Sequence, residues 1–186
     1  MSFLSNVRAG LTRLSRASAL SGLYLLFLVA LAVSADVIVR KLFGIAFVGT
    51  DELGGYVMAI ATSWALSYAF LEGAHIRVNV IHLTMAPAPK AWLDVLAAAV
   101  TALIVGLLAW HVWILAFESW EFDVVSNTPL RLPLWIPQFM FLAGIVLFLA
   151  SAVVVMLESL GHALQGRYAQ ASSLSEERAQ VEEYTS

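Results

Sequence analysis

Four long apolar runs divide the chain, and each is long enough to cross a bilayer as one helix. They cover about residues 17–39, 53–71, 92–117 and 133–157. A spanning helix needs about 20 mostly apolar residues. Acidic residues stand near the ends of the runs, as Asp36, Glu72, Asp94 and Glu158 do, where a carboxylate reaches headgroups or water at little cost. The pattern predicts an all-α membrane protein with four transmembrane helices.

The first run also has features of a secretory signal. Arg8, Arg13 and Arg16 precede it, and the small residues at 33–35 are typical of a cleavage site. Apolar character resumes at 37–39, however, and gives the run the length of a span rather than that of a signal core. We therefore expect this segment to be retained as the first transmembrane helix.

Lysine and arginine predict the orientation, because cytoplasmic loops carry an excess of them. With alternating spans, seven of the ten lie on the side of both termini, and only Arg40, Lys41 and Arg131 lie on the other. Both termini are therefore expected in the cytoplasm. The predicted organisation is a cytoplasmic segment at 1–16, a four-helix membrane domain at 17–164 and a polar cytoplasmic tail at 165–186.

Composition narrows the function classes. The chain is 61% hydrophobic and 12% charged, with a mean hydropathy of +0.85, far from the values of a soluble domain. A net charge of -3 argues against nucleic acid as a partner, since that requires a concentrated basic surface. The absence of cysteine excludes disulfides, thiol redox chemistry, Fe–S clusters and covalently attached haem.

The segment after the second run is the first candidate site. Its residues are Glu72, Gly73, His75 and Arg77. Glycine at this position can end the helix, and arginine suits an interface with anionic lipid. Apolar positions 76, 80 and 83 follow at helical spacing, which predicts a short interfacial helix between spans two and three. The segment is either a helix end with a membrane anchor or a contact surface for another subunit or a lipid headgroup.

The segment before the fourth run is the second candidate. Pro129, Pro133 and Pro137 forbid a regular helix through it, and Trp135 suits the aromatic belt at the membrane surface. It is either a rigid turn, built around Pro129, Pro133 and Trp135, or an outward platform for a soluble partner. The charges of such a periplasmic docking surface would be Glu118, Glu121, Asp123 and Arg131.

The start of the second run is the third candidate. Thr50 can cap the helix, and Asp51 and Glu52 favour its N-terminal dipole. Gly54 and Gly55 lack side-chain bulk and would let a neighbouring backbone approach. The acidic pair could instead bind a coupling ion, but no matching polar groups lie mid-membrane.

The remaining polar residues in the spans predict no chemistry. Thr62, Ser63 and Ser67 carry hydroxyls that a helix can satisfy internally. A haem held between two helices needs two histidines at matching depth, and His111 has no such partner in the predicted spans. We therefore predict no catalytic, cofactor-binding or metal-binding residue.

Taken together, the motifs resemble a known family. The run Glu72–Val78 at the end of the second span resembles the signature of the small membrane subunit of tripartite ATP-independent periplasmic (TRAP) transporters, the DctQ-like family. Asp51–Leu53 is similar to that family's second-helix start, and Thr128–Leu130 with Leu132–Trp135 is similar to its approach to the last span. Leu71 and Asn79 depart from the family, which often has a basic residue and an aspartate there.

The resemblance implies a supporting role in secondary active transport. A large multi-span subunit would move the substrate, often a carboxylate, together with a cation, and a periplasmic binding protein would deliver it. The small subunit would enlarge the fixed scaffold in the bacterial inner membrane and help dock the binding protein, without enzymatic activity. Two other classes stay open: a four-helix haem-binding electron-transfer protein, and a stand-alone membrane scaffold or small channel.

Overall fold

The computed structural model describes residues 2–45, 49–72 and 87–164. This part of the chain forms four long helices: α1 (Ser2–Phe43), α2 (Thr50–Leu71), α4 (Pro87–Glu121) and α5 (Trp135–Leu164). Each is long and apolar enough to cross a membrane. The predicted all-α membrane fold with four transmembrane helices is confirmed.

The helices extend further than the apolar runs that predicted them. Helix α1 has 42 residues, about 63 Å at 1.5 Å per residue, whereas a hydrocarbon core is about 30 Å thick. The predicted separate segment at 1–16 is thus, from Ser2 onward, the first part of α1. Helix α5 begins at Trp135 instead of Pro133, because Pro133 forms an isolated bridge with Val125.

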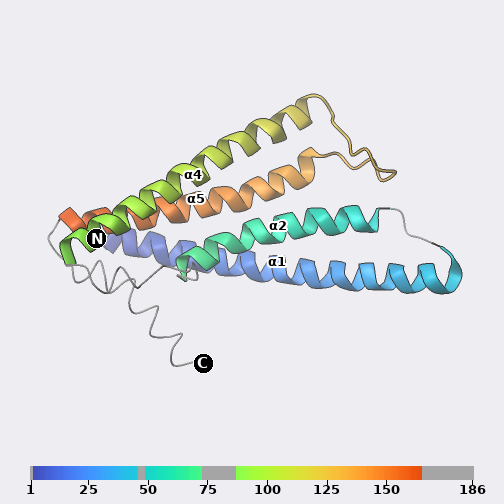
Figure 1. The fold of residues 1–186 in the computed structure, drawn as a ribbon, viewed down its shortest axis with the longest axis horizontal. Coiled ribbons are helices and arrows are strands. Elements are labelled where there is room, and N and C mark those ends of the chain that lie inside the picture. The colour runs from blue at the N-terminus through green and yellow to red at the C-terminus, as the bar shows by residue number, and fades with distance from the viewer. Residues whose placement is uncertain (1, 46–48, 73–86, 165–186) are drawn as a thin grey trace, which may run out of the picture.

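The helices pack in the spatial order α1, α2, α5, α4 (Figure 1). The main contacts join α1 to α2, α2 to α5 and α5 to α4, with a smaller contact between α1 and α5. In this order α2 and α5 lie in the middle, while α1 and α4 form the two outer sides. The fold is therefore an open layer of helices, and most of the outer helices' surface faces away from the chain.

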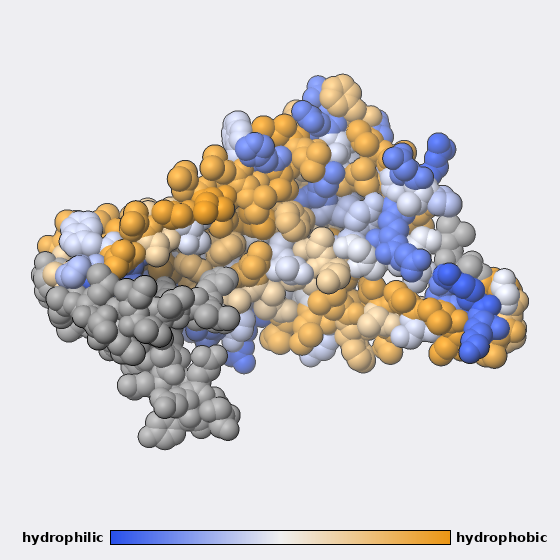
Figure 2. All heavy atoms as spheres, in the orientation of Figure 1, coloured by the Kyte–Doolittle hydropathy of each residue, from blue (hydrophilic) through white to orange (hydrophobic). Residues whose placement is uncertain are grey.

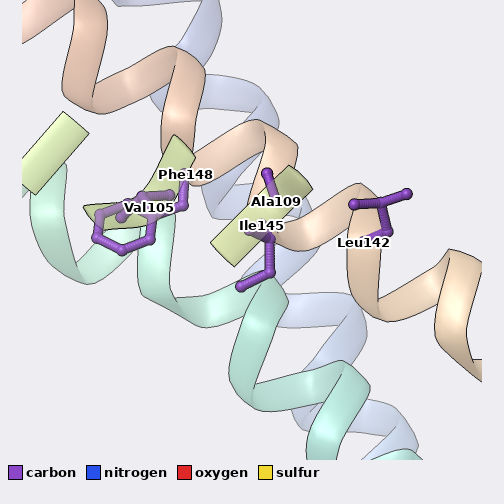
Figure 3. Packing of buried hydrophobic residues seen from close by; sticks show 5 residues of the cluster. All are labelled: Val105, Ala109, Leu142, Ile145 and Phe148. Atoms are coloured by element: carbon purple, nitrogen blue, oxygen red, sulfur yellow. The ribbon is translucent and has the colours of Figure 1, made fainter. Parts of the chain in front are cut away.

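Helices α4 and α5 pack through a small apolar core (Figure 3). Val105 and Ala109 of α4 meet Leu142, Ile145 and Phe148 of α5 in this cluster. The buried positions of α4 recur along one narrow face, as expected for a helix that contacts a single neighbour. Large residues fill the α5 side and smaller ones the α4 side, which allows a close approach.

A chain of three serine hydroxyls connects α1, α2 and α5. Ser67 Oγ of α2 lies 2.7 Å from Ser15 Oγ of α1 and 2.7 Å from Ser151 Oγ of α5, and all three side chains are fully buried. The expectation that the span hydroxyls are satisfied within their own helix is right for Thr62 and Ser63 but wrong for Ser67. Its position on the α2 face between two helices makes interhelical partners available.

Two glycines allow the closest helix approaches. A Cβ added at Gly144 of α5 would lie 2.4 Å from Ser63 Oγ and 2.7 Å from Trp64 Cδ1 of α2. A Cβ at Gly22 of α1 would lie 3.0 Å from Ala61 Cα of α2. Small residues at such crossings are typical of membrane helices. The sequence prediction did not single out either glycine.

The unpartnered surfaces are strongly apolar. Figure 2 shows hydrophobic residues along the outer sides of α4 and α1, with hydrophilic residues gathered mainly near the helix ends. Bulky exposed side chains include Tyr24 and Phe27 of α1 and Ile104 and Trp110 of α4. An apolar surface of this extent needs lipid or other transmembrane helices to cover it.

Candidate functional site

The α4–α5 loop (residues 122–134) folds back on itself as a closed turn. The backbone N–H of Ser126 donates to Leu132 O at 2.9 Å, and that of Leu134 donates to Val124 O at 3.0 Å. These bonds flank the antiparallel bridge between Val125 and Pro133. Proline is tolerated at position 133 because Ser126 and Leu134 donate the bonds beside the bridge, so the missing N–H of Pro133 leaves no bond unmade.

The tip of the loop is a four-residue turn from Thr128 to Arg131. Arg131 N–H donates to Thr128 O at 3.1 Å, and Pro129 stands at the second position of the turn, where its fixed φ is favourable. Arg131 and Asp123 both have φ of 47°, a left-handed conformation that is uncommon outside glycine. The turn thus carries a strained arginine at its exposed end.

The start of α2 lies against this turn. Gly49 is the N-cap residue, with φ of 87° and no side-chain capping bond, so the prediction that Thr50 caps the helix is wrong. A Cβ at Gly49 would lie 2.9 Å from Leu130 Cδ1. Glycine is required here both for the left-handed φ and for the close approach of Leu130.

Glu52 joins the two segments through hydroxyl groups. Tyr56 Oη donates to Glu52 Oε1 at 2.6 Å, and Thr128 Oγ1 donates to Glu52 Oε2. Thr128 Oγ1 also lies 2.8 Å from Ser126 Oγ. The acid that the sequence associated with the helix dipole therefore has a second role, because it holds a loop 76 residues away in the chain.

The charges predicted for docking lie at this end of the molecule. Glu118 and Glu121 belong to the last turn of α4, and Asp123 and Arg131 belong to the α4–α5 loop. All four side chains are exposed. They surround the end of α4 and the tip of the loop, and a soluble partner could reach each of them.

Trp135 begins a row of aromatic side chains between α4 and α5. Its ring lies 6.4 Å from that of Phe139, which lies 6.0 Å from Trp113. The row continues along α4 through Phe117 to Trp120, with centroid distances of 6.2 and 5.7 Å. Aromatic pairs at these distances stabilise packing, so the base of the loop rests on a rigid support.

The predicted packing glycines have different surroundings. A Cβ at Gly54 would contact Val29 and Val33 of α1 at 3.8 and 4.0 Å, and one at Gly55 would meet nothing within 4 Å. Gly55 therefore faces away from the described part of the chain. The helix-packing role of Gly54 and Gly55 stays a prediction.

The predicted signature after α2 is described only at its first residue. Glu72 forms the C-cap of α2, with its N–H donating to Tyr68 O and Phe70 O. Gly73, His75 and Arg77, together with the predicted interfacial helix, lie outside the described residues, as does the polar tail. Their contact role stays a prediction.

Two ion pairs involve α1. Arg8 Nη1 of α1 lies 2.9 Å from Glu158 Oε2 of α5, and both side chains are largely buried. Arg40 donates to Asp36 one turn earlier on α1, where the aspartate is fully buried. Both acids are thus paired with an arginine, as acids within spans generally are.

The described histidines do not form a pair. His111 Nδ1 lies 2.8 Å from Leu107 O on the exposed side of α4, and His162 lies near the other end of the α4–α5 pair, where Ala163 packs on Ala91. These two imidazoles therefore cannot hold one haem between them. Across residues 2–45, 49–72 and 87–164, no group of three or more metal-binding side chains was found.

Comparison with known families matches most of the chain. The family model described as tripartite ATP-independent periplasmic transporters, DctQ component, covers residues 29–162. This range contains both the start of α2 and the α4–α5 loop. Searches of curated proteins and of solved structures found no match.

Proposed function

The chain belongs to the DctQ component family of tripartite ATP-independent periplasmic transporters, and we propose that it is the small, non-transporting scaffold subunit of such a system. In this role it sits in the bacterial inner membrane with both termini in the cytoplasm. It supports a large multi-span subunit that performs cation-coupled uptake of an organic acid or a similar solute. The family match over residues 29–162 carries this proposal.

The open layer of helices supports a scaffold role. A protein that moved substrate by itself would need a polar path between its helices. Here the buried serines of α1, α2 and α5 bond one another, and Arg8 of α1 pairs with Glu158 of α5. The exposed apolar sides of α1 and α4 leave a large area for lipid and for a partner's helices. Such a layer extends the membrane-embedded surface of a partner without a conduction path of its own.

The end of the molecule that carries the α4–α5 loop is our proposed docking surface for the periplasmic binding protein. Its charges are Glu118, Glu121, Asp123 and Arg131, all exposed. Charges at the rim of an interface steer encounter and select the partner. The hydrogen-bonded loop keeps them in one arrangement before the partner arrives, which lowers the entropy cost of binding.

Copurification and uptake test the proposal. An affinity tag on this chain at native expression should recover a much larger multi-span protein. Deletion of the chain should abolish accumulation of the solute that the purified binding protein retains, with that solute identified by mass spectrometry. Recovery of this chain alone, with accumulation intact after deletion, would instead indicate a stand-alone membrane scaffold.

A further inference from the structure

We propose that Glu52 is a positioning residue that holds the α4–α5 loop in the shape recognised by the soluble binding protein. This inference rests on the proposed function and assigns a role to a residue outside the docking surface itself. Glu52 belongs to the first turn of α2, and the loop lies between two other helices. In Figure 1 the loop extends from α4 and α5 toward the beginning of α2.

The first step is the bonding of the carboxylate. Oε1 accepts from Tyr56 one turn along the same helix, which restricts the rotamer of Glu52. Oε2 then accepts from Thr128. Hydrogen bonds to an ionised carboxylate are about twice as strong as neutral ones. With a hydroxyl donor on each oxygen, the geometry indicates a holding role rather than a site for a coupling ion.

The second step is the hydrogen bond that links the conformation of Arg131 to the position of Thr128. The side chain of Thr128 is bonded to Glu52, and its backbone oxygen accepts from Arg131 N–H at 3.1 Å. Arg131 adopts φ of 47°, a strained conformation that persists only where the surroundings impose it. Release of Thr128 would therefore let Arg131 relax and leave its present direction.

A second contact makes the loop and the start of α2 one unit. Leu130 packs on the Cβ-free side of Gly49, the residue that caps α2. Gly49 and Glu52 thus contact Leu130 and Thr128, two residues of the same turn. Because the contact between Leu130 and Gly49 remains when Glu52 is replaced, loss of Glu52 should loosen the turn without unfolding the helices.

Binding of the purified binding protein to the complex tests this role. The complex of this chain with its large subunit is placed in nanodiscs, and affinity is measured by biolayer interferometry. Glu52→Gln and Thr128→Val should each weaken binding roughly three- to tenfold. Thr128→Ser keeps the hydroxyl and should bind within about twofold of the wild type. Thr101→Val is the matched control, because the Thr101 hydroxyl bonds Ala97 O of its own helix.

A double variant distinguishes loss of the contact between Glu52 and Thr128 from a general loss of stability. Glu52→Gln combined with Thr128→Val should weaken binding no more than the stronger single change does. The reason is that both changes act on the same contact, the one between Glu52 and Thr128. Recovery of the large subunit during purification should stay at the wild-type level in every variant. Unchanged affinity in Glu52→Gln and Thr128→Val, or fully additive losses, would overturn the inference. Failure of the wild-type complex to bind the binding protein would instead overturn the proposed function, and this inference with it.

Discussion

The hydroxyl of Ser67 lies 2.7 Å from that of Ser151 across the α2–α5 contact, with both side chains fully buried. Ser67 also meets Ser15 of α1, so one residue joins the two central helices to an outer one. Interhelical hydrogen bonds in membranes are individually modest, about 0.6 kcal/mol on average and up to about 1.7. The arrangement nevertheless fixes the rotation of three helices at one level.

Replacing Ser67 with alanine should therefore destabilise the isolated chain measurably. The loss removes two buried bonds, and we expect a cost of about 1–2 kcal/mol, visible as a lower midpoint of unfolding in detergent. Ser34→Ala is the control, because Ser34 is exposed and bonds Ala30 O of its own helix. Equal midpoints for the two variants would show that the serine chain contributes no stability.

Replacing Gly144 with alanine should force α2 and α5 apart. The new methyl group would lie 2.4 Å from Ser63 Oγ and 2.7 Å from a backbone carbon of α2, and overpacking of this kind typically costs about 1–3 kcal/mol. Gly161→Ala on the same helix has no neighbour within 4 Å and should be neutral or slightly stabilising. The unfolding midpoints in detergent compare the two, and a neutral Gly144→Ala would contradict the close approach.

Replacing Gly55 with leucine should separate internal packing from packing against the partner. Gly55 has no neighbour within 4 Å, so the fold of the isolated chain should keep its unfolding midpoint. If the large subunit packs on this side of α2, its copurification should fall several-fold, because a small residue allows close approach of helices. Undiminished recovery of the large subunit would place the interface elsewhere.

Reversing the ion pair between Arg8 and Glu158 tests the contact between α1 and α5. Arg8→Glu should destabilise the chain, since it leaves two acids facing each other in a largely buried setting. The swapped double variant, Arg8→Glu with Glu158→Arg, should recover about 1 kcal/mol of that loss. Thermal unfolding of the wild type, of each single variant (Arg8→Glu and Glu158→Arg) and of the double variant gives the coupling. A double variant no more stable than Arg8→Glu would argue against the pair.

Reversing the exposed charges of the proposed docking surface should weaken binding of the periplasmic protein without affecting assembly with the large subunit. Glu118→Lys, Glu121→Lys and Arg131→Glu together should slow association of the binding protein by about tenfold at low salt, with a smaller effect at high salt. Arg13→Glu, an exposed charge on α1 far from the loop, is the control. Unchanged association would mean that the binding protein docks through other residues.

Much of the architecture followed from the linear pattern because each span must satisfy its backbone internally and present apolar side chains to lipid. The four helices were predicted on that basis, whereas the family was predicted from the resemblance of separate motifs. Their ends were not, since helix α1 continues through a polar stretch that contains Arg8 and Ser15, and a hydropathy pattern does not distinguish a solvated helix from a solvated coil. Packing on two other helices supplies the stabilisation there, through Glu158 of α5 for Arg8 and Ser67 of α2 for Ser15.

By itself, the sequence determined that this chain has four membrane spans, because length and apolarity are local properties. Its motifs, by their resemblance to the family, indicated the TRAP small subunit. It also identified the acidic start of α2 and the proline-rich loop as two separate features. Only the tertiary structure decided that Glu52 of the first bonds Thr128 of the second. That contact, like those of Ser67 and Gly144, depends on how helices that are distant in the chain pack and on how each is rotated. Hydrophobic periodicity identifies the buried face of a helix but does not specify which residues of another helix it meets.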